Sequence, residues 1–237
     1  GHAEANWNLG CPYPTVAGRG RGAGLLPYPE RIDAILAAVV AAAPVRLSVK
    51  LRLGYRDPDE VAAVMAVLNR YPLTEVILHA RTAVQMYGGE VDLSRAAEAL
   101  AACHHPFVYN GDIASPEGFA ALRQRLPGTA AWMIGRGALA YPFLPARLKG
   151  AALPPAETRR RLLREFHDRL AEGYSRWLSG PGHRLDKMKE QWAYLALAFA
   201  PARQILSRIR RSDTLSACDD AVAWALEQPL AEPAEQH

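Results

Sequence analysis

The chain has 237 residues, half of them apolar and 22% charged, which excludes an intrinsically disordered protein. Its length suffices for one large domain, or for one domain with a smaller second one. Its 28 Lys and Arg residues only slightly outnumber its 24 Asp and Glu residues, so the formal net charge of +4 does not by itself identify a partner.

The first expected element ends in a turn that contains a cysteine. Asn8 and Leu9 finish a short strand, Gly10 lets the backbone turn, and Pro12 fixes the backbone beside Cys11. We expect the thiol of Cys11 to be presented rather than buried, although a lone cysteine beside glycines is usually structural.

A glycine-rich segment follows this cysteine. Glycines at positions 18, 20, 22 and 24 alternate with Arg19, Arg21 and Ala23. The pattern predicts a flexible loop with two cations, which suits RNA or a phosphate.

Strands and helices then alternate to about residue 149. Further strands are expected at residues 45–53, 75–79, 106–110 and 130–134. Helices are expected at residues 29–43, 57–69 and 92–103, from residue 115 onward, and from residue 137 to about 149. This alternation predicts parallel strands covered by helices, hence an α/β barrel or a doubly wound sheet.

Polar residues follow the carboxyl end of each expected strand, which is where barrel enzymes keep their active sites. They are Cys11, Lys50 with Arg52, His79 with Arg81, Asn110 with Asp112, and Gly135 with Arg136.

The last two strand ends suggest which part of a barrel is present. Barrels commonly bind phosphate with the loops after strands seven and eight. If Asn110-Gly111-Asp112 and Gly135-Arg136-Gly137 are those loops, the first strand here is strand four. We therefore expect a (β/α)8 TIM-barrel type fold of which only strands 4–8 are present, as an open sheet with two exposed edges. Three preceding units, on the order of 90 residues, would be absent.

The composition changes after a proline-containing linker at residues 150–156. Helical periodicity at 157–178, 183–200, 201–211 and 213–227 predicts an all-helical second domain over residues 157–237, after a barrel domain over residues 1–149. The last ten residues are expected to form a frayed tail. Arginines cluster at 159–161 with 164, and at 203, 208, 210 and 211. A helix face lined in this way suits a phosphate backbone, but it is also typical of an ordinary solvated surface.

The three cysteines, Cys11, Cys103 and Cys218, are widely spaced and form no CxxC pair. This argues against a disulfide framework and a zinc site, and it fits a reducing cytoplasm. No signal peptide is expected, and the longest apolar runs, such as residues 34–45, are too short to span a bilayer. We expect a cytoplasmic protein with neither membrane association nor a metal.

Five motifs carry a family resemblance, at residues 8–26, 49–54, 78–82, 110–113 and 133–138. In order and spacing they resemble the motifs of tRNA-dihydrouridine synthases, flavoenzymes that reduce a uridine of tRNA to 5,6-dihydrouridine. The resemblance implies a TIM-barrel oxidoreductase that uses FMN, with NADPH as the reductant, and that binds tRNA. The glycine-rich loop is most similar to that of the subfamily acting on the D-loop.

Reduction of the C5–C6 double bond of uracil needs a hydride at C6 and a proton at C5. Protein side chains supply no hydride, so a flavin or a nicotinamide must. An exposed thiol can supply the proton, which makes Cys11 the candidate catalytic acid, and the resemblance assigns it the same role. Lys50 would stabilise the negative charge near N1 and O2 of the reduced flavin. The resemblance gives flavin contacts to His79 and Asn8.

The remaining candidates would bind phosphates. Asn110, Gly111, Asp112, Gly135 and Arg136 would hold the FMN phosphate through backbone N–H groups and a guanidinium. The expected RNA-binding residues are Arg19, Arg21, Arg159, Arg160, Lys187 and Lys189. The expected partner is tRNA, bound by a monomer.

Two other functions stay open from the sequence. One is an FMN oxidoreductase acting on a small molecule, of the dihydroorotate or dihydropyrimidine dehydrogenase type, which would not need an arginine-rich helical region. The other is an inactive, truncated chain that binds RNA without flavin.

Overall fold

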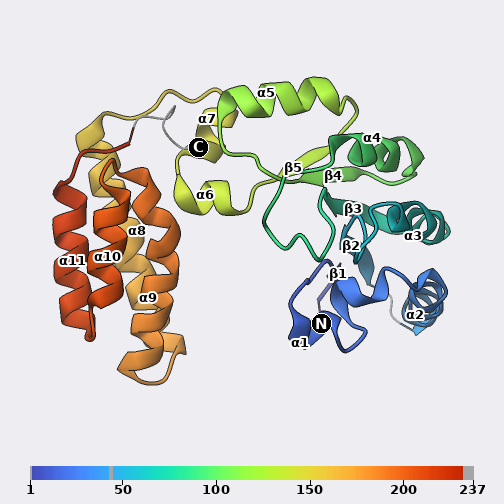
Figure 1. The fold of residues 1–237 in the computed structure, drawn as a ribbon, viewed down its shortest axis with the longest axis horizontal. Coiled ribbons are helices and arrows are strands. Elements are labelled where there is room, and N and C mark those ends of the chain that lie inside the picture. Colours follow the sequence, from blue (N-terminus) through green and yellow to red (C-terminus); the bar gives the residue numbers. More distant parts are fainter. Residues whose placement is uncertain (1, 43–44, 232–237) are drawn as a thin grey trace. The chain divides into compact units, whose positions relative to one another are not determined.

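The computed structural model describes residues 2–42 and 45–231. It divides into two compact units, residues 1–113 with 118–135, and residues 114–117 with 136–237. Figure 1 shows the first unit as a sheet with helices and the second as helices alone among its described elements.

The first unit is built on five parallel strands in the order β1-β2-β3-β4-β5. The strands are β1 Glu4–Leu9, β2 Arg46–Arg52, β3 Leu73–His79, β4 Phe107–Asn110 and β5 Ala131–Met133. Neighbours in the sheet are also neighbours in sequence, so each connection has to cross over from one end of the sheet to the other. The predicted α/β class and the predicted five-stranded open sheet are confirmed, with β1 and β5 as the edges in the described part of the chain.

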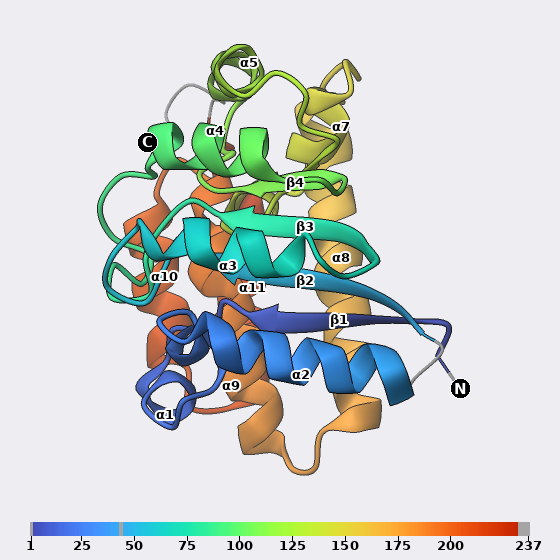
Figure 2. The same cartoon turned by 90° about the vertical axis from the view of Figure 1, so that its right-hand side faces the viewer.

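Helices make these crossings. They are α2 Pro29–Ala42, α3 Glu60–Leu68, α4 Leu93–Ala102 and α5 Pro116–Arg125, and α2, α3 and α4 lie along one face of the sheet (Figure 2). Pro29 is the first residue of α2. Proline is tolerated there because an N–H in the first turn has no acceptor within the helix, so its absence costs no hydrogen bond. Asp92 caps α4 by accepting a hydrogen bond from the backbone N–H of Arg95 at 2.9 Å.

The predicted start of α3 at residue 57 was wrong. The helix begins at Glu60, whose carboxylate accepts hydrogen bonds from the backbone N–H groups of Tyr55, Arg56 and Asp57. Residues 55–59 therefore form a turn that Glu60 closes, and Asp57 belongs to that turn and not to the helix cap.

The core of the first unit lies on one face of the sheet. Along β2, Val49 and Leu51 are fully buried, whereas Ser48 and Lys50, which alternate with them, are only half-buried. Side chains alternate between the two faces of a strand, so the apolar set packs against the helices and the polar set points to the other face. We call that second surface the open face.

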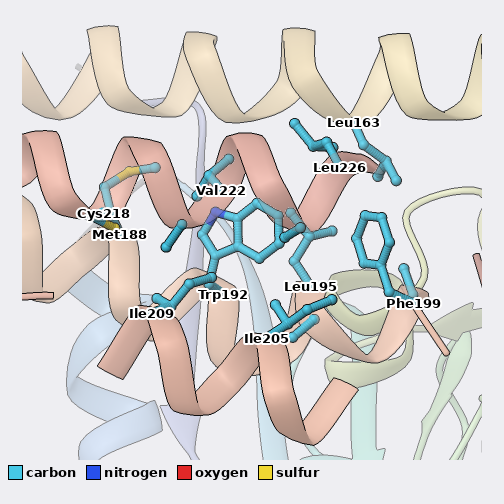
Figure 3. Packing of buried hydrophobic residues seen from close by; sticks show 14 of the residues in the cluster. Leu163, Met188, Trp192, Leu195, Phe199, Ile205, Ile209, Cys218, Val222 and Leu226 are labelled. Carbon is cyan, nitrogen blue, oxygen red and sulfur yellow. The ribbon is translucent and has the colours of Figure 1, made fainter. Parts of the chain in front are cut away.

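The second unit consists of helices. They are α6 Arg136–Ala140, α7 Leu144–Leu148, α8 Ala156–Trp177, α9 Pro181–Leu195, the 3-10 turn η2 Ala196–Ala198, α10 Ala202–Arg211 and α11 Leu215–Glu227. Helices α8 to α11 enclose an apolar core around Trp192, which is 1% exposed (Figure 3). The expected helix from 137 to 149 is broken at Pro142, because proline cannot donate a helical hydrogen bond. By their packing α6 and α7 belong to this unit, not to the first one.

The predicted frayed tail was wrong for residues 228–231. Leu230 forms an antiparallel bridge with Phe199, and the N–H of Ala231 donates to the carbonyl of Ala198 at 2.9 Å. These bonds hold the end of α11 against η2. Residues 232–237 lie outside the described part of the chain.

Candidate active site

Four predicted site residues share the open face at the carboxyl end of the sheet. The strand register pairs Asn8 with Lys50, and His79 with Asn110. Lys50 pairs with Ile77, two residues before His79, so all four side chains lie on the same face. Toward the other end, this face is hollowed into an open groove of about 710 Å³ that includes Asn6, Ser48, Ile77 and Met133.

Cys11 follows β1 and is half-buried. Its carbonyl accepts a hydrogen bond from the backbone N–H of Ala23 at 3.1 Å, and the side chain of Asn8 accepts one from the N–H of Gly10 at 2.9 Å. Asn8 thus caps a turn that directs the chain toward Cys11.

The glycine-rich loop is packed, so the prediction of a flexible loop was wrong. It contains α1 Pro14–Ala17 and the 3-10 turn η1 Gly22–Leu25, whose four residues are all buried. Gly22 has a φ of +54°, and a Cβ there would lie 2.9 Å from the carbonyl oxygen of Cys11. A Cβ on Gly24 would lie 2.1 Å from the carbonyl oxygen of Ala17. Glycine at these two positions therefore lets the loop pack closely against the backbone of Cys11 and Ala17. Arg19 and Arg21 of the same loop are exposed.

Arg52 ties the Cys11 loop to the loop after β3. It is 2% exposed, its Nε donates to the carbonyl of Gly10 at 3.1 Å, and its Nη1 donates to the carbonyls of Thr82 and Met86 at 2.8 and 2.7 Å. The guanidinium also lies 5.4 Å from the centre of the Tyr87 ring. The sequence named Arg52 together with Lys50 at the end of this strand, but it could not show these contacts.

The pKa values of the two basic groups of the open face are both lowered. Burial and then the charge of Arg52 lower the pKa of the Lys50 ammonium. Burial, followed by the charges of Arg52, Lys50 and Arg81, lowers the pKa of His79 to about 3, so its ring is neutral near pH 7. Nη1 of Arg81 lies 3.5 Å from Nε2 of His79. A guanidinium can only donate, so Nε2 is the acceptor and the ring proton sits on Nδ1.

Arg81 is a structural strut. Its guanidinium donates to both carboxylate oxygens of Asp112, at 2.9 and 2.6 Å, and to the carbonyls of Gly88 and Gly89 at 3.1 and 2.6 Å. Asp112 has a φ of +43°, in the left-handed region that non-glycine residues rarely adopt. The pairing of Arg81 with Asp112 joins the loops after β3 and β4.

The other phosphate-site candidates are placed as follows. The side-chain amide of Asn110 donates to the carbonyl of Met133 at 2.9 Å, which fixes it against β5. Gly111 has a φ of +148°, and a Cβ there would lie 2.9 Å from the Tyr109 hydroxyl. Gly135 ends the first unit and Arg136 begins the second, so each belongs to a different unit, and their predicted phosphate site stays a prediction.

The sequence of this chain matches the model of a known protein family. The family model described as Dihydrouridine synthase (Dus) matches residues 1–221 of the 237. The chain belongs to the dihydrouridine synthase family. The resemblance read from the five sequence motifs is thereby confirmed.

Individual dihydrouridine synthases agree with the family model. A probable tRNA-dihydrouridine synthase of Rhodobacter capsulatus is 32% identical over 209 residues, which cover 85% of this chain and 63% of that protein. A tRNA-dihydrouridine(16) synthase of Cupriavidus necator is 31% identical, covering 86% of this chain and 64% of the relative. The tRNA-dihydrouridine synthase B of Escherichia coli is 32% identical, covering 70% and 56%. The chain thus spans less than two thirds of the length of these dihydrouridine synthases.

The RNA-binding residues predicted for this family member in the second unit differ in availability. Arg159 is only 9% exposed, so little of its side chain is open to solvent, and its RNA contact stays a prediction. Arg160 is half-buried and donates to the carbonyl of Gln228 at 3.3 Å. Lys187 is exposed but forms an ion pair with Glu190 at 2.5 Å, whose hydrogen bond raises the pKa of the lysine. Lys189 is half-buried.

The described residues also bear on a metal site and on a membrane-spanning helix. Residues 2–42 and 45–231 contain no group of three or more His, Cys, Asp or Glu side chains that could hold a metal ion. In the same residues, no helix has the length and apolar character needed to cross a membrane.

Proposed function

We propose that this dihydrouridine synthase chain carries the flavin-binding and uridine-binding face of the enzyme and takes part in reducing a tRNA uridine to 5,6-dihydrouridine. The observation that carries the proposal is the joint position of Asn8, Lys50, His79 and Asn110 on one open face, with Cys11 directly after the first strand. The name of the Cupriavidus necator relative specifies position 16, and we propose a D-loop uridine as the substrate.

The charges at this face fit FMN. Lys50, Arg52 and Arg81 are cations, and Asp112 is the carboxylate that Arg81 binds, so the cluster carries net positive charge beside a neutral His79. Such a cluster favours an anionic group, which suits both a phosphate and the reduced isoalloxazine ring. Lys50 and His79 would contact the ring, whereas Asn110 and Gly111, with Gly135 and Arg136, would hold the phosphate end.

When bound, FMN supplies the hydride for C6 of uracil, with NADPH as the reductant that restores it. The protein's part is the proton for C5. The Sγ–H of Cys11 gives this proton to C5, and the thiol regains one from solvent because the side chain is half-buried and not sealed. The hydrogen bonds from the Ala23 N–H to the Cys11 carbonyl and from Arg52 Nε to the Gly10 carbonyl fix the backbone that carries the thiol.

The whole enzyme, in this proposal, is a (β/α)8 barrel in which β1 to β5 are strands 4–8 and an N-terminal part supplies the others. Five parallel strands in sequential order, with an open and partly polar second face, are what five adjacent strands of such a barrel would form. Residues 157–237, beyond the linker at 150–156, form the tRNA-binding helical domain. We propose a cytoplasmic monomer that uses tRNA as its substrate.

The test uses the 237-residue protein and two cysteine variants. The visible absorption spectrum after addition of FMN reports binding, and mass spectrometry of digested tRNA reports dihydrouridine formed with NADPH present. We expect bound flavin in the unmodified protein, and Cys11→Ala should keep the flavin but lose dihydrouridine formation. Cys103→Ala is the matched control, because Cys103 is also half-buried and lies outside the site.

Either of two results would contradict the proposal. Undiminished dihydrouridine formation by Cys11→Ala would remove this thiol as the proton donor. Reduction of free dihydropyrimidine-type substrates, with tRNA left unmodified, would favour the small-molecule oxidoreductase.

A further inference from the structure

Helix α10 presents an arginine face with no acidic residue on the helix. Ala202–Arg211 contains no Asp or Glu, and Ile205 and Ile209, 0% and 1% exposed, pack into the core of the second unit (Figure 3). Arg203, Arg210 and Arg211 are exposed. Arg203 and Arg210 are seven residues apart, about two turns, so they lie on the same side of the helix.

Three other exposed cations of the second unit are already paired with acidic residues on their own helices. Arg161 binds Glu165, Arg176 binds Glu172 and Lys187 binds Glu190, each at 2.5 Å and three or four residues apart. Within residues 2–42 and 45–231, the side chains of Arg203, Arg210 and Arg211 have no ion pair or hydrogen bond. Arg208, their neighbour, is stacked 4.8 Å over the ring of Trp224.

Helix stability does not explain this arrangement. Cations in the last turn, such as Arg210 and Arg211, complement the negative end of the helix dipole. Arg203 lies in the first turn, where the dipole disfavours a cation, and two adjacent arginines repel each other at the other end. All three side chains are therefore available to an external anion without first giving up an acidic partner.

We propose that Arg203, Arg210 and Arg211, which we call the α10 face, bind the phosphate backbone of tRNA. The proposal rests on the proposed function, because tRNA is the polyanion that function requires. An arginine can contact a phosphate with two parallel N–H donors, and each phosphate neutralised releases condensed counterions. Of the residues predicted to contact RNA, Arg159 is buried and Lys187 is already paired with Glu190. The three arginines of the α10 face are exposed and have no such ion pair among the described residues.

The experiment compares two triple variants of the full chain. The first carries Arg203→Gln, Arg210→Gln and Arg211→Gln. The control carries Arg161→Gln, Arg169→Gln and Arg176→Gln, which removes the same number of positive charges from exposed residues of α8 in the same unit. Dissociation constants for unmodified tRNA are measured from 50 to 200 mM KCl, after circular dichroism has shown equal helix content.

Each phosphate contact contributes about 0.7 to 0.9 to the slope of log K against log salt concentration. The α10 variant should therefore lower the slope by about 2 to 3, and the control should lower it by less than half as much. Equal losses in the two variants, a larger loss in the control, or no salt-dependent tRNA binding by the unmodified chain would overturn the proposal.

Dihydrouridine formation, measured on the same samples, separates this proposal from the proposed function. If the chain binds tRNA through the α10 face but forms no dihydrouridine, the surface stands and the catalytic proposal fails. If dihydrouridine forms while the α10 variant binds tRNA as the control does, the surface alone is wrong. Preferential capture of anionic lipid vesicles over tRNA would also overturn the surface assignment.

Discussion

Replacing Arg52 by methionine should loosen the loop that carries Cys11. The substitution keeps the length of the side chain and removes the donors to three carbonyl oxygens, those of Gly10, Thr82 and Met86. A buried acceptor left without its donor costs about 1 to 3 kcal/mol, so three acceptors at the lower bound give about 3 kcal/mol. Relaxation of the loops and entry of water limit the loss to about 5 kcal/mol.

Hydrogen–deuterium exchange with peptide-level resolution measures this loss where it occurs. We expect the opening free energies of segments 10–26 and 82–89 to fall by about 3 kcal/mol or more in Arg52→Met, because Arg52 is the residue that bonds to both. The rate at which iodoacetamide alkylates Cys11 should rise in parallel, since the thiol becomes more accessible.

Arg46→Met is the matched control, because Arg46 is an exposed residue of the same strand that pairs with Glu4. Its effect on both segments should stay within about 0.5 kcal/mol. A loss below about 1 kcal/mol in Arg52→Met would refute the reasoning, because the three bonds would then not hold the two loops together.

Three further predictions concern burial, packing and charge. The Nδ1 of His167 accepts a hydrogen bond from Nε1 of Trp192 at 3.1 Å, and burial, partly opposed by Asp219, lowers the pKa of this histidine. The stability it supports is therefore complete above its unfolded pKa near 6.5 and is lost as the pH falls, so melting temperatures should drop from pH 8 to pH 5 less steeply in His167→Asn. Gly24→Ala should cost about 1 to 3 kcal/mol in urea unfolding, whereas Gly135→Ala, with open space around it, should cost little. Asp112→Asn should speed amide exchange in segment 82–89, where Arg81 bonds to two carbonyls, and unchanged exchange would contradict the strut.

The sheet was predictable because its signals are local. Each strand is a short apolar run followed by a polar residue, and the covering helices have caps that can be read from the sequence, such as Asp92 before α4. Parallel strands bring their carboxyl ends to one edge, so the alignment of Asn8, Lys50, His79 and Asn110 followed from the strand assignments alone.

What the sequence did not reveal depends on contacts between distant residues. The glycines at 22 and 24 were assigned to a flexible loop, because glycine permits both mobility and close packing, and only the positions of the Cys11 and Ala17 carbonyls distinguish the two. Arg52 lies 42 residues from Gly10, and nothing in the local sequence predicts that its guanidinium bonds to that carbonyl.

The arginines of the second unit show that one missed feature was nevertheless present in the sequence. The clusters at 159–161 with 164 and at 203–211 each contain four arginines, but α8 has glutamates four residues from Arg161 and Arg176, whereas α10 has no acid at any position. Residues four apart on a helix are neighbours, so such spacing indicates which cations are paired. Counting arginines therefore favours α8, whereas counting arginines without an acid three or four residues away favours α10.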